Sequence, residues 1–379
     1  MILISIYMLA VISVLYLVTS VLVARKVIFN YNKPNNQKLK QQPGVSILKP
    51  IKGIDDDLAN NLISFFEQDY KNFELIFGFQ DALDPAIPLV KRVMSGYNQI
   101  NARIIVDNRN LGRNPKINNL LNMYPQINHS YILISDSNTR VNKNFLNTMM
   151  KTILEPGVGL VTATVRGVGI GSAASVMENL HLNTFIAPNV FLADKVARKP
   201  LAIGKSMLFH KSVLDQLGGF KSFKDFLGED YLFGKWVTEL GLKVRILPEF
   251  VDNINISWNF NRFLNRHTRW AKMRRHTHIG YYLGEPISNP VFLGLIILLN
   301  SLDVTGLLIF SLLSGFKLVH DFYMTSLLQQ RLPVHYYGLG IIKDLIIGFI
   351  WTVPFFSYKV KWRGNKYRIY KNTFIQPAY

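Results

Sequence analysis

The chain begins with 24 residues that carry no charged side chain, and Arg25 is the first charge. About 20 consecutive apolar residues span a bilayer as one helix, so residues 1–24 are predicted to be an N-terminal transmembrane anchor. A basic start and a small-residue cleavage site are missing, which favours an anchor over a removed signal peptide. The positive-inside rule places the chain after residue 24 in the cytoplasm, because basic residues come next: Arg25, Lys26, Lys33, Lys38 and Lys40.

Two further apolar stretches lie near the C-terminus, at 290–316 and 336–356. We expect about two transmembrane helices within residues 290–357, with a re-entrant or interfacial segment as the alternative. Their ionisable residues are costly in lipid and are expected to face protein or water; these are Asp303, Lys343 and Asp344. Two crossings would return residues 358–379, a basic tail, to the cytoplasm.

Between residues 44 and 260 the pattern changes to short apolar runs that alternate with helical periodicity. The runs VSILKP, FELIFGF, ARIIV and YILIS predict buried strands, and the segments between them predict helices. Such alternation predicts an α/β domain with a mostly parallel sheet. Ligands bind such sheets beyond the carboxyl ends of the strands. The carboxylates at those ends suggest a metal-assisted phosphate or diphosphate site. The residues at the strand ends are Lys49, Pro50, Gln80, Asp81, Asp107 and Asp136.

The composition excludes cysteine-based chemistry and limits the classes of expected binding partner. None of the 379 residues is a cysteine, so disulfides, zinc–thiolate sites and thiol nucleophiles are excluded. The net charge of +19 suits anionic lipid, a phosphorylated substrate or nucleic acid. Much of the positive charge lies beside apolar stretches, which favours a membrane surface. No base-reading motif accompanies the charge, so nucleic acid is not an expected partner.

Two acidic positions and one basic segment are candidates for chemistry. Asp136 follows a strand directly and can hold Mg²⁺ or Mn²⁺ together with substrate phosphates, although an aspartate in a simple turn gives the same pattern. Glu229 and Asp230 precede a helix, where they either complement the helix dipole or supply a general base. The basic segment 261–288 is either an interfacial helix on anionic lipid, a nucleic-acid contact, or a diphosphate site in which Arg269 donates two hydrogen bonds.

The order of these residues resembles that of the processive-type inverting glycosyltransferases with a GT-A nucleotide-sugar fold. Their pattern is three spaced aspartates followed by (Gln/Arg)-x-x-Arg-Trp. Within that group the chain is similar to the ceramide glucosyltransferase family from about residue 45 to 368. Asn138 departs from the Asp-x-Asp of the wider fold, as the ceramide branch does. The similar segments are ILKPIKGIDDDLANNL, QDALDPAI, NPKINNLL, SDSNTRV, VLDQLGGF, GEDY, RHTRWAKMR and KWRGNKYR.

The resemblance implies a GT-A domain with a mostly parallel sheet, one N-terminal anchor and an inverting transfer of a hexose. The implied donor is a UDP-sugar, with glucose as the hexose, and the implied acceptor is the hydroxyl of a membrane lipid, ceramide. It also implies a divalent cation, Mg²⁺ or Mn²⁺, at Asp136 and a catalytic base at Asp230. The residues expected to contact the substrate or nucleotide include Lys49 and Pro50, which end the first strand. The resemblance adds Asp81, Asp84, Lys116, Arg266, Arg269 and Trp270.

Other functions stay open from the sequence. A hopanoid-type lipid, a glycerolipid or a growing polysaccharide could be the acceptor, although two C-terminal spans are few for a polymer channel. A membrane-anchored nucleotide-binding scaffold without turnover is the non-enzymatic alternative, and the joint presence of Asp136, Asp230 and Arg269 argues against it. The expected location is integral to a membrane with the catalytic domain facing the cytoplasm, in a bacterial inner membrane or a eukaryotic Golgi or ER membrane.

Overall fold

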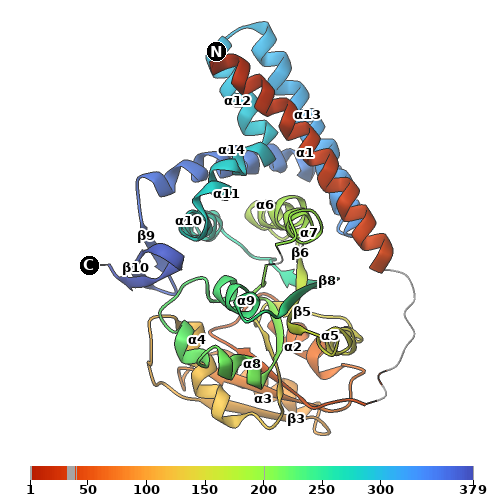
Figure 1. Ribbon diagram of the computed structural model, residues 1–379, viewed down its shortest axis with the longest axis vertical. Coiled ribbons are helices and arrows are strands. Elements are labelled where there is room, and N and C mark those ends of the chain that lie inside the picture. The colour runs from red at the N-terminus through yellow and green to blue at the C-terminus, as the bar shows by residue number, and fades with distance from the viewer. Residues whose placement is uncertain (1, 32–38, 40, 200, 379) are drawn as a thin grey trace.

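A computed structural model describes residues 2–31, 39, 41–199 and 201–378. An α/β body forms one end of the molecule, and three helices project from it at the other end (Figure 1). Arg25 and Lys26 lie within the first helix, whereas Lys33, Lys38 and Lys40 lie outside the described residues.

An eight-stranded mixed sheet forms the centre of the body, with the order β3-β2-β1-β4-β7-β6-β8-β5. The first four strands in this order are parallel, β7 runs antiparallel to both of its neighbours, and β6 and β8 are parallel. The strands are β1 (Val45–Pro50), β2 (Phe73–Phe79), β3 (Asn101–Val106), β4 (Tyr131–Ser135), β5 (Thr139–Arg140), β6 (Val158–Val168), β7 (Ser206–His210) and β8 (Lys243–Ile254).

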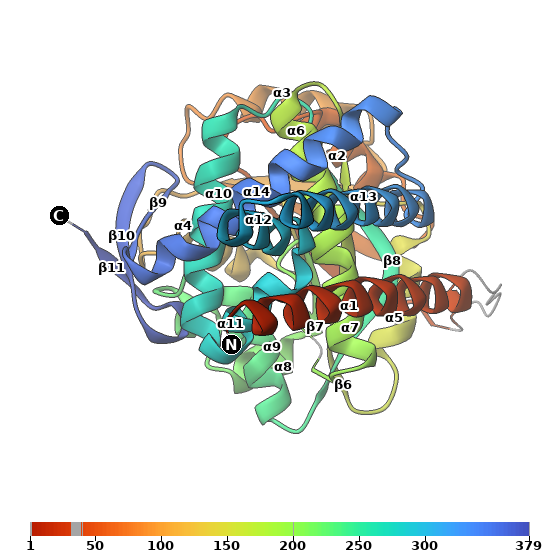
Figure 2. The same ribbon diagram turned by 90° about the horizontal axis from the view of Figure 1, so that it is seen from above.

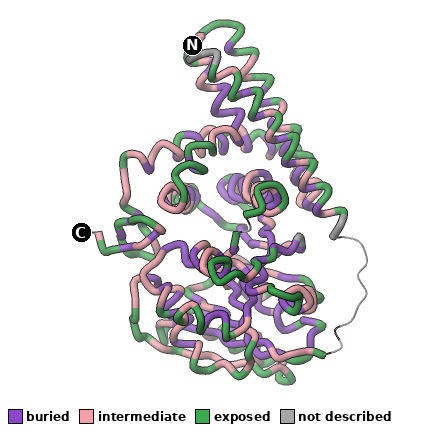
Figure 3. Tube along the Cα trace, in the orientation of Figure 1, coloured by how far each residue is buried: buried purple, intermediate pink, exposed green. Residues whose placement is uncertain are grey.

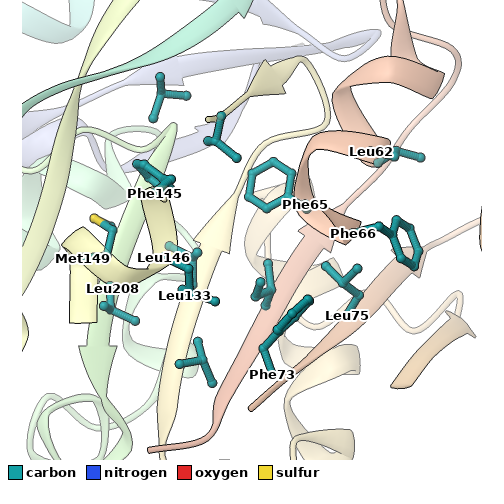
Figure 4. Packing of buried hydrophobic residues seen from close by; sticks show 14 of the residues in the cluster. Leu62, Phe65, Phe66, Phe73, Leu75, Leu133, Phe145, Leu146, Met149 and Leu208 are labelled. Atoms are coloured by element: carbon teal, nitrogen blue, oxygen red, sulfur yellow. The ribbon is translucent and has the colours of Figure 1, made fainter. Parts of the chain in front are cut away.

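Alternate residues of the central strands enter two separate cores. Ile47, Leu75 and Leu133 point to one face of the sheet, while Leu48 and Ile76 point to the other. Both faces are covered, which explains why these strands are continuous apolar runs. Helices α2 (Leu58–Phe66), α3 (Ala86–Ser95) and α5 (Phe145–Ile153) cover the first face (Figure 4), and α4 (Pro115–Met123), α8 (Lys211–Gln216) and α9 (Glu229–Glu239) cover the second.

A layer of helices lies between the sheet and the projecting bundle (Figure 1). It consists of α6 (Ala173–His181), which continues through one π-helical segment (Leu182–Ile186) into α7 (Ala187–Lys195), and of α10 (Phe260–Thr277). A π-bulge inside a helix is often found at functional sites. This layer therefore separates the sheet of the α/β body from the membrane helices.

The projecting bundle contains α1 (Ile2–Tyr31), α12 (Pro290–Ser301) and α13 (Val304–Leu327), which lie side by side (Figures 1 and 2). Large apolar side chains cover its outer faces; Val11, Leu15 and Leu312, for example, are 61%, 60% and 71% exposed. Figure 3 shows the same outward exposure along α1 and α13. An apolar surface of this extent fits contact with lipid, and the predicted N-terminal anchor is confirmed.

Two candidate spans lie in the C-terminal region, as expected, but their bounds differ from the predicted ones. The stretch 290–316 was expected to cross the membrane as one helix, but it breaks where Leu302 adopts the left-handed conformation and the Asp303 side chain caps α13. Composition and length alone give three candidate spans among the described residues, or four if the bent pair Ile279–Ser288 and Pro290–Ser301 is one span. The third candidate contains α14 (Gly338–Thr352), which lies across the base of the bundle in both views (Figures 1 and 2). This position agrees with the interfacial alternative.

The basic C-terminal segment is folded rather than extended. It forms a three-stranded antiparallel sheet of β9 (Lys359–Trp362), β10 (Asn365–Ile369) and β11 (Ile375–Pro377). Tyr367 and Ile375 pack with Leu227 of the body. The C-terminal segment therefore lies on the same side of the membrane helices as the body, as predicted.

Candidate active site

Asp136 follows β4 at the carboxyl end of the parallel strands and is held between two ammonium groups. Its Oδ1 is 3.0 Å from Lys116 Nζ, and its Oδ2 is 3.0 Å from Lys205 Nζ. Burial by itself would raise the pKa of Asp136, but the two lysines outweigh it and hold that pKa well below its usual range. Asp136 is therefore a carboxylate at every pH of interest.

Lys116 joins Asp136 to a second carboxylate. Its Nζ lies 3.2 Å from Glu229 Oε1 and donates to the carbonyl of Gly204 at 3.0 Å. Asn114 fixes this position because its Oδ1 caps α4 and its Nδ2 donates to Glu229. Burial opposes the charge on Lys116, yet Asp136, Glu229 and Asp230 together raise the pKa of Lys116. Burial raises the pKa of Glu229, and Lys116 only partly offsets this.

Asp230 lies in the first turn of α9, next to this cluster. Its Oδ2 accepts from the N–H of Gly204 at 3.0 Å, and its Oδ1 accepts from the N–H of Tyr231 at 2.8 Å. An added Cβ at Gly204 would lie 2.9 Å from Asp230 Oδ2. A larger residue at position 204 would therefore require the Asp230 carboxylate to shift. The two hydrogen bonds orient the side chain of Asp230.

Lys49, at the end of β1, is fully buried and holds the end of β4. Its Nζ donates to the carbonyl of Asp136 at 2.8 Å and lies 3.6 Å from the centre of the Phe65 ring. Burial holds the pKa of Lys49 well below its usual value. In this structure the side chain of Lys49 positions Asp136, and a direct contact between Lys49 or Pro50 and a nucleotide stays a prediction.

Asp84 and Asp81 lie in the loop after β2 and do not join the lysine cluster. Asp84 is buried, accepts from the N–H of Gly53 at 2.8 Å, and so ties this loop to the one after β1. Asp81 is exposed, and its side chain accepts only from the N–H of Leu83, at 2.9 Å, among the described residues. The pair lies at the same sheet edge as Asp136, and its contact with a nucleoside stays a prediction.

The Arg-x-x-Arg-Trp segment lies on α10. The Arg266 guanidinium is 3.0 Å from the fully buried Glu178 of α6, and it covers the rings of Trp258 and Trp270 at 5.0 and 4.3 Å. Arg269 differs, because its side chain has no hydrogen bond or ion pair within the described part of the chain. Burial, followed by Arg266 and Arg363, lowers the pKa of Arg269 to about 10. Arg269 remains cationic at neutral pH and available to an anion.

The donor set limits how a metal ion could be held. No group of three or more His, Asp or Glu side chains in the described ranges is placed to bind a metal. Asp136 supplies one carboxylate, and the Asn138 carbonyl beside it accepts from Lys205 at 2.6 Å. Mg²⁺ usually keeps several waters and takes one or two carboxylates plus substrate phosphates. A cation of that kind would need substrate phosphates beside Asp136, whose two oxygens each contact a lysine, and Asp136 as its protein ligand stays a prediction.

Sequence reasoning missed two charged residues of this region. Lys205 stands alone before β7 in an apolar segment, and Glu178 lies in an amphipathic helix, so neither belongs to a motif. Only their partners identify them: Lys205 with Asp136, and Glu178 with Arg266 and His267. These contacts join distant parts of the chain, and a local pattern carries no signal of them.

Comparisons with known proteins agree with the sequence motifs. The model of "Glycosyl transferase family 21" matches residues 5–375. Ceramide glucosyltransferase 3 of Caenorhabditis elegans is 28% identical over 339 residues, which cover 86% of this chain and 73% of that protein. Ceramide glucosyltransferase 1 of the same organism is 29% identical over 335 residues, with 86% and 72% covered. The solved mannosyltransferase PcManGT from Pyrobaculum calidifontis, in complex with GDP-Man and Mn²⁺, is 14% identical, covers 92% of this chain and 99% of its own, and gives a TM-score of 0.49.

The family match covers nearly the whole chain, so this chain belongs to glycosyl transferase family 21. The resemblance indicated by the sequence motifs is confirmed. The chain is a membrane glycosyltransferase, and the non-enzymatic scaffold is set aside.

Proposed function

We propose that this enzyme transfers glucose from UDP-glucose to the primary hydroxyl of ceramide, with inversion at the anomeric carbon. The observation that carries the proposal is the clustering of Asp136, Lys116 and Lys205 beside the oriented carboxylate of Asp230. The two lysines of this cluster suit a leaving diphosphate, and the carboxylate of Asp230 suits the role of a base. The names of its relatives, ceramide glucosyltransferases matched over most of their length, support glucose as the sugar and ceramide as the acceptor.

The donor's diphosphate is assigned to the cationic side of the site. Lys116 and Lys205 flank Asp136 at the carboxyl end of β4, and Arg269 lies near enough to Glu229 for their charges to interact. The guanidinium of Arg269 has no partner among the described residues, and its planar fork can donate two hydrogen bonds to phosphate oxygens. Asp84 and Asp81 are then assigned to contact the nucleoside of the donor.

Asp230 is assigned as the base of a single displacement. The acceptor oxygen forms a bond to the anomeric carbon while the bond from that carbon to the UDP oxygen breaks, and Asp230 takes the hydroxyl proton. The positive groups of the cluster stabilise the charge that develops on UDP. A divalent cation bound at Asp136 would supply further neutralisation of the diphosphate.

The catalytic body is assigned to the cytoplasmic side of the membrane, where nucleotide sugars are made. Arg25 and Lys26 lie at the body end of α1, and the folded C-terminal sheet beside the body is basic. Both features agree with the positive-inside rule. The acceptor would then reach the site from the bilayer and the donor from the cytoplasm.

The test uses purified full-length protein in lipid nanodiscs with Mg²⁺ or Mn²⁺, UDP-sugars and defined lipids. We expect a glucosylceramide product by mass spectrometry and matched release of UDP. Asp230→Asn should lower kcat by about 10²–10⁴ while UDP affinity, measured by calorimetry, stays close to that of the wild type. Wild-type turnover by this variant would remove Asp230 as the base. A product on a glycerolipid or a hopanoid-type lipid, but not on ceramide, would overturn the acceptor and retain the transferase.

A further inference from the structure

The hairpin formed by β9 and β10 presents one face made of cations. In the register of the two strands, Lys359 lies opposite Arg368, and Lys361 lies opposite Lys366. Because side chains alternate along a strand, these four exposed residues share one face of the hairpin, which we call the cationic face. Like charges directly opposite each other in an antiparallel pair are destabilising. An anionic partner on the cationic face would remove that cost.

Within the described residues, the cationic face has no counterion of its own. None of its four side chains forms an ion pair with another described part of the chain. Asp344 is the last acidic residue of the sequence, so the three strands of this sheet contain no aspartate or glutamate. Val360 and Tyr367 point to the opposite face of the hairpin and pack with Leu227. The cationic face is therefore directed away from the α/β body.

The hairpin follows the membrane region directly in the chain. Helix α14 crosses the base of the bundle, and from its end the chain runs into β9 (Figures 1 and 2). Between them lies Phe356, whose side chain is 87% exposed, as suits a residue in contact with lipid. Lys361 comes five residues after Phe356, and five residues extend over at most about 18 Å. The cationic face is thus within reach of the lipid headgroups beside α14.

Anionic phospholipid is the partner that fits this position and this charge. Clusters of roughly four to eight lysines and arginines next to a membrane helix bind anionic headgroups. The membrane is tethered to the same chain through α1 and α13, so its effective concentration at the hairpin is high. A soluble polyanion such as nucleic acid would have to compete with it. Residues 358–379 contain six cations and no acid: Lys359, Lys361, Arg363, Lys366, Arg368 and Lys371.

We propose that the cationic face docks onto the anionic phospholipid headgroups of the membrane that holds α1 and α13. The sheet passes this restraint to the active site, because the buried Thr373 accepts from two N–H groups just before Asp230. Its carbonyl accepts from Leu227 and its Oγ1 accepts from Gly228, both at 2.9 Å. Docking therefore fixes the active site relative to the lipid surface. This inference goes beyond the proposed function and needs neither its donor nor its acceptor.

The test measures the approach of the hairpin to lipid headgroups with a fluorescent label. Because the chain has no cysteine, Asn365→Cys in the full-length protein gives a single labelling site beside the hairpin turn. The protein is placed in nanodiscs of phosphatidylcholine, with or without phosphatidylglycerol, that contain a trace of lipid with a quencher on its headgroup. We expect quenching to increase when phosphatidylglycerol is present and to decrease again at high salt.

The double variant Lys361→Gln/Lys366→Gln removes one like-charge pair from the cationic face. It should lower the ratio of docked to undocked hairpin in anionic nanodiscs by roughly tenfold or more. Its thermal unfolding in neutral nanodiscs should occur at or above the wild-type temperature, because the removed pair is repulsive. The matched control is Lys91→Gln/Arg92→Gln, which removes two cations from α3 at the end of the body far from the bundle (Figure 1).

Three outcomes would overturn the lipid surface. They are equal quenching in neutral and anionic nanodiscs, equal losses in the hairpin and α3 variants, and reversal of quenching by an added oligonucleotide that binds the wild type but not the hairpin variant. Transfer of glucose to ceramide is measured separately. Docking without any glucosylated product would retain the lipid surface and refute the proposed function, and product without docking would do the reverse.

Discussion

Replacing Lys116 with methionine tests the charge balance of the site. Methionine keeps an unbranched stem and removes the ammonium that lies 3.0 Å from Asp136, 3.2 Å from Glu229 and 3.0 Å from the carbonyl of Gly204. In the variant, Lys205 is left as the ammonium paired with Asp136, and Glu229 has no ion-pair partner within the described residues. The donor's diphosphate would then approach two carboxylates with one fewer cation between them.

The expected loss depends on how far these groups are buried. The side chains of Lys116, Asp136 and Glu229 are 16%, 26% and 10% exposed. Exposed pairs contribute about 0–1 kcal/mol, whereas breaking a buried pair costs about 3–5 kcal/mol. Because Lys205 still pairs with Asp136, we expect the lower end, about 3 kcal/mol. This figure is a loss of folding stability. Separately, the loss of one positive group facing the leaving diphosphate should lower kcat/KM for UDP-glucose by roughly 100-fold.

The assay titrates UDP-glucose at saturating ceramide, with UDP affinity measured separately by calorimetry. The loss of Lys116 raises the pKa of Glu229 further, so UDP binding by the variant should recover partly as the pH is lowered and Glu229 takes up a proton. Lys235→Met is the control, since Lys235 pairs with Glu239 at 3.7 Å on the exposed side of α9. A Lys116→Met enzyme with kcat/KM within about threefold of the wild type would refute the charge balance described here.

Two further substitutions separate geometry from charge. Gly204→Ala places a Cβ 2.9 Å from Asp230 Oδ2. The base is then displaced, so kcat should fall about 10–100-fold while UDP affinity is unchanged. Equal losses in kcat and in UDP affinity would contradict the assignment of Asp230. Glu178→Gln breaks the buried pair with Arg266 and should destabilise the folded protein by about 3–5 kcal/mol at pH 7, which thermal unfolding in detergent would detect. Burial opposes the charge on Glu178, but Arg266 and His267 lower its folded pKa below 4.5; the wild-type advantage is therefore present above about pH 4.5 and is lost as the pH falls further.

The sheet and its helices were predictable because the sequence features that specify them, apolar runs and helix caps, lie within the elements themselves. Strands β1, β2 and β4 are buried on both faces and therefore appear in the sequence as unbroken apolar runs. Asn114 before Pro115 marks the start of α4 for the same reason, since cap and helix are adjacent in the chain. Asp136 and Asp230 were predictable candidates because they follow a strand and begin a helix, respectively.

The membrane region was predicted less well because hydropathy does not show where a helix ends. The stretch 290–316 is nearly continuous in apolar character, and its turn depends on one left-handed residue, Leu302, and one cap, Asp303. Lys343 and Asp344 were correctly expected to avoid lipid: both are buried, they pair with each other at 2.7 Å, and Asp344 also pairs with Lys317 of α13. Which partner they would find was beyond the sequence.

The basic helix α10 shows why charge alone was ambiguous. As a pattern it fits a surface helix on anionic lipid, a nucleic-acid contact or a diphosphate site equally well. In the structure most of its cations are used inside the protein: Arg266 pairs with Glu178, Arg274 pairs with Glu285, and Lys272 donates to the carbonyl of Lys359. Arg275 contacts only the rings of Phe355 and Tyr358, and Arg269 has no hydrogen bond, ion pair or ring contact in the described chain. An unmatched, partly buried guanidinium that interacts electrostatically with Glu229 suits a diphosphate, so the pairing of its neighbours, rather than the total charge, is the reason why we propose a diphosphate contact for Arg269.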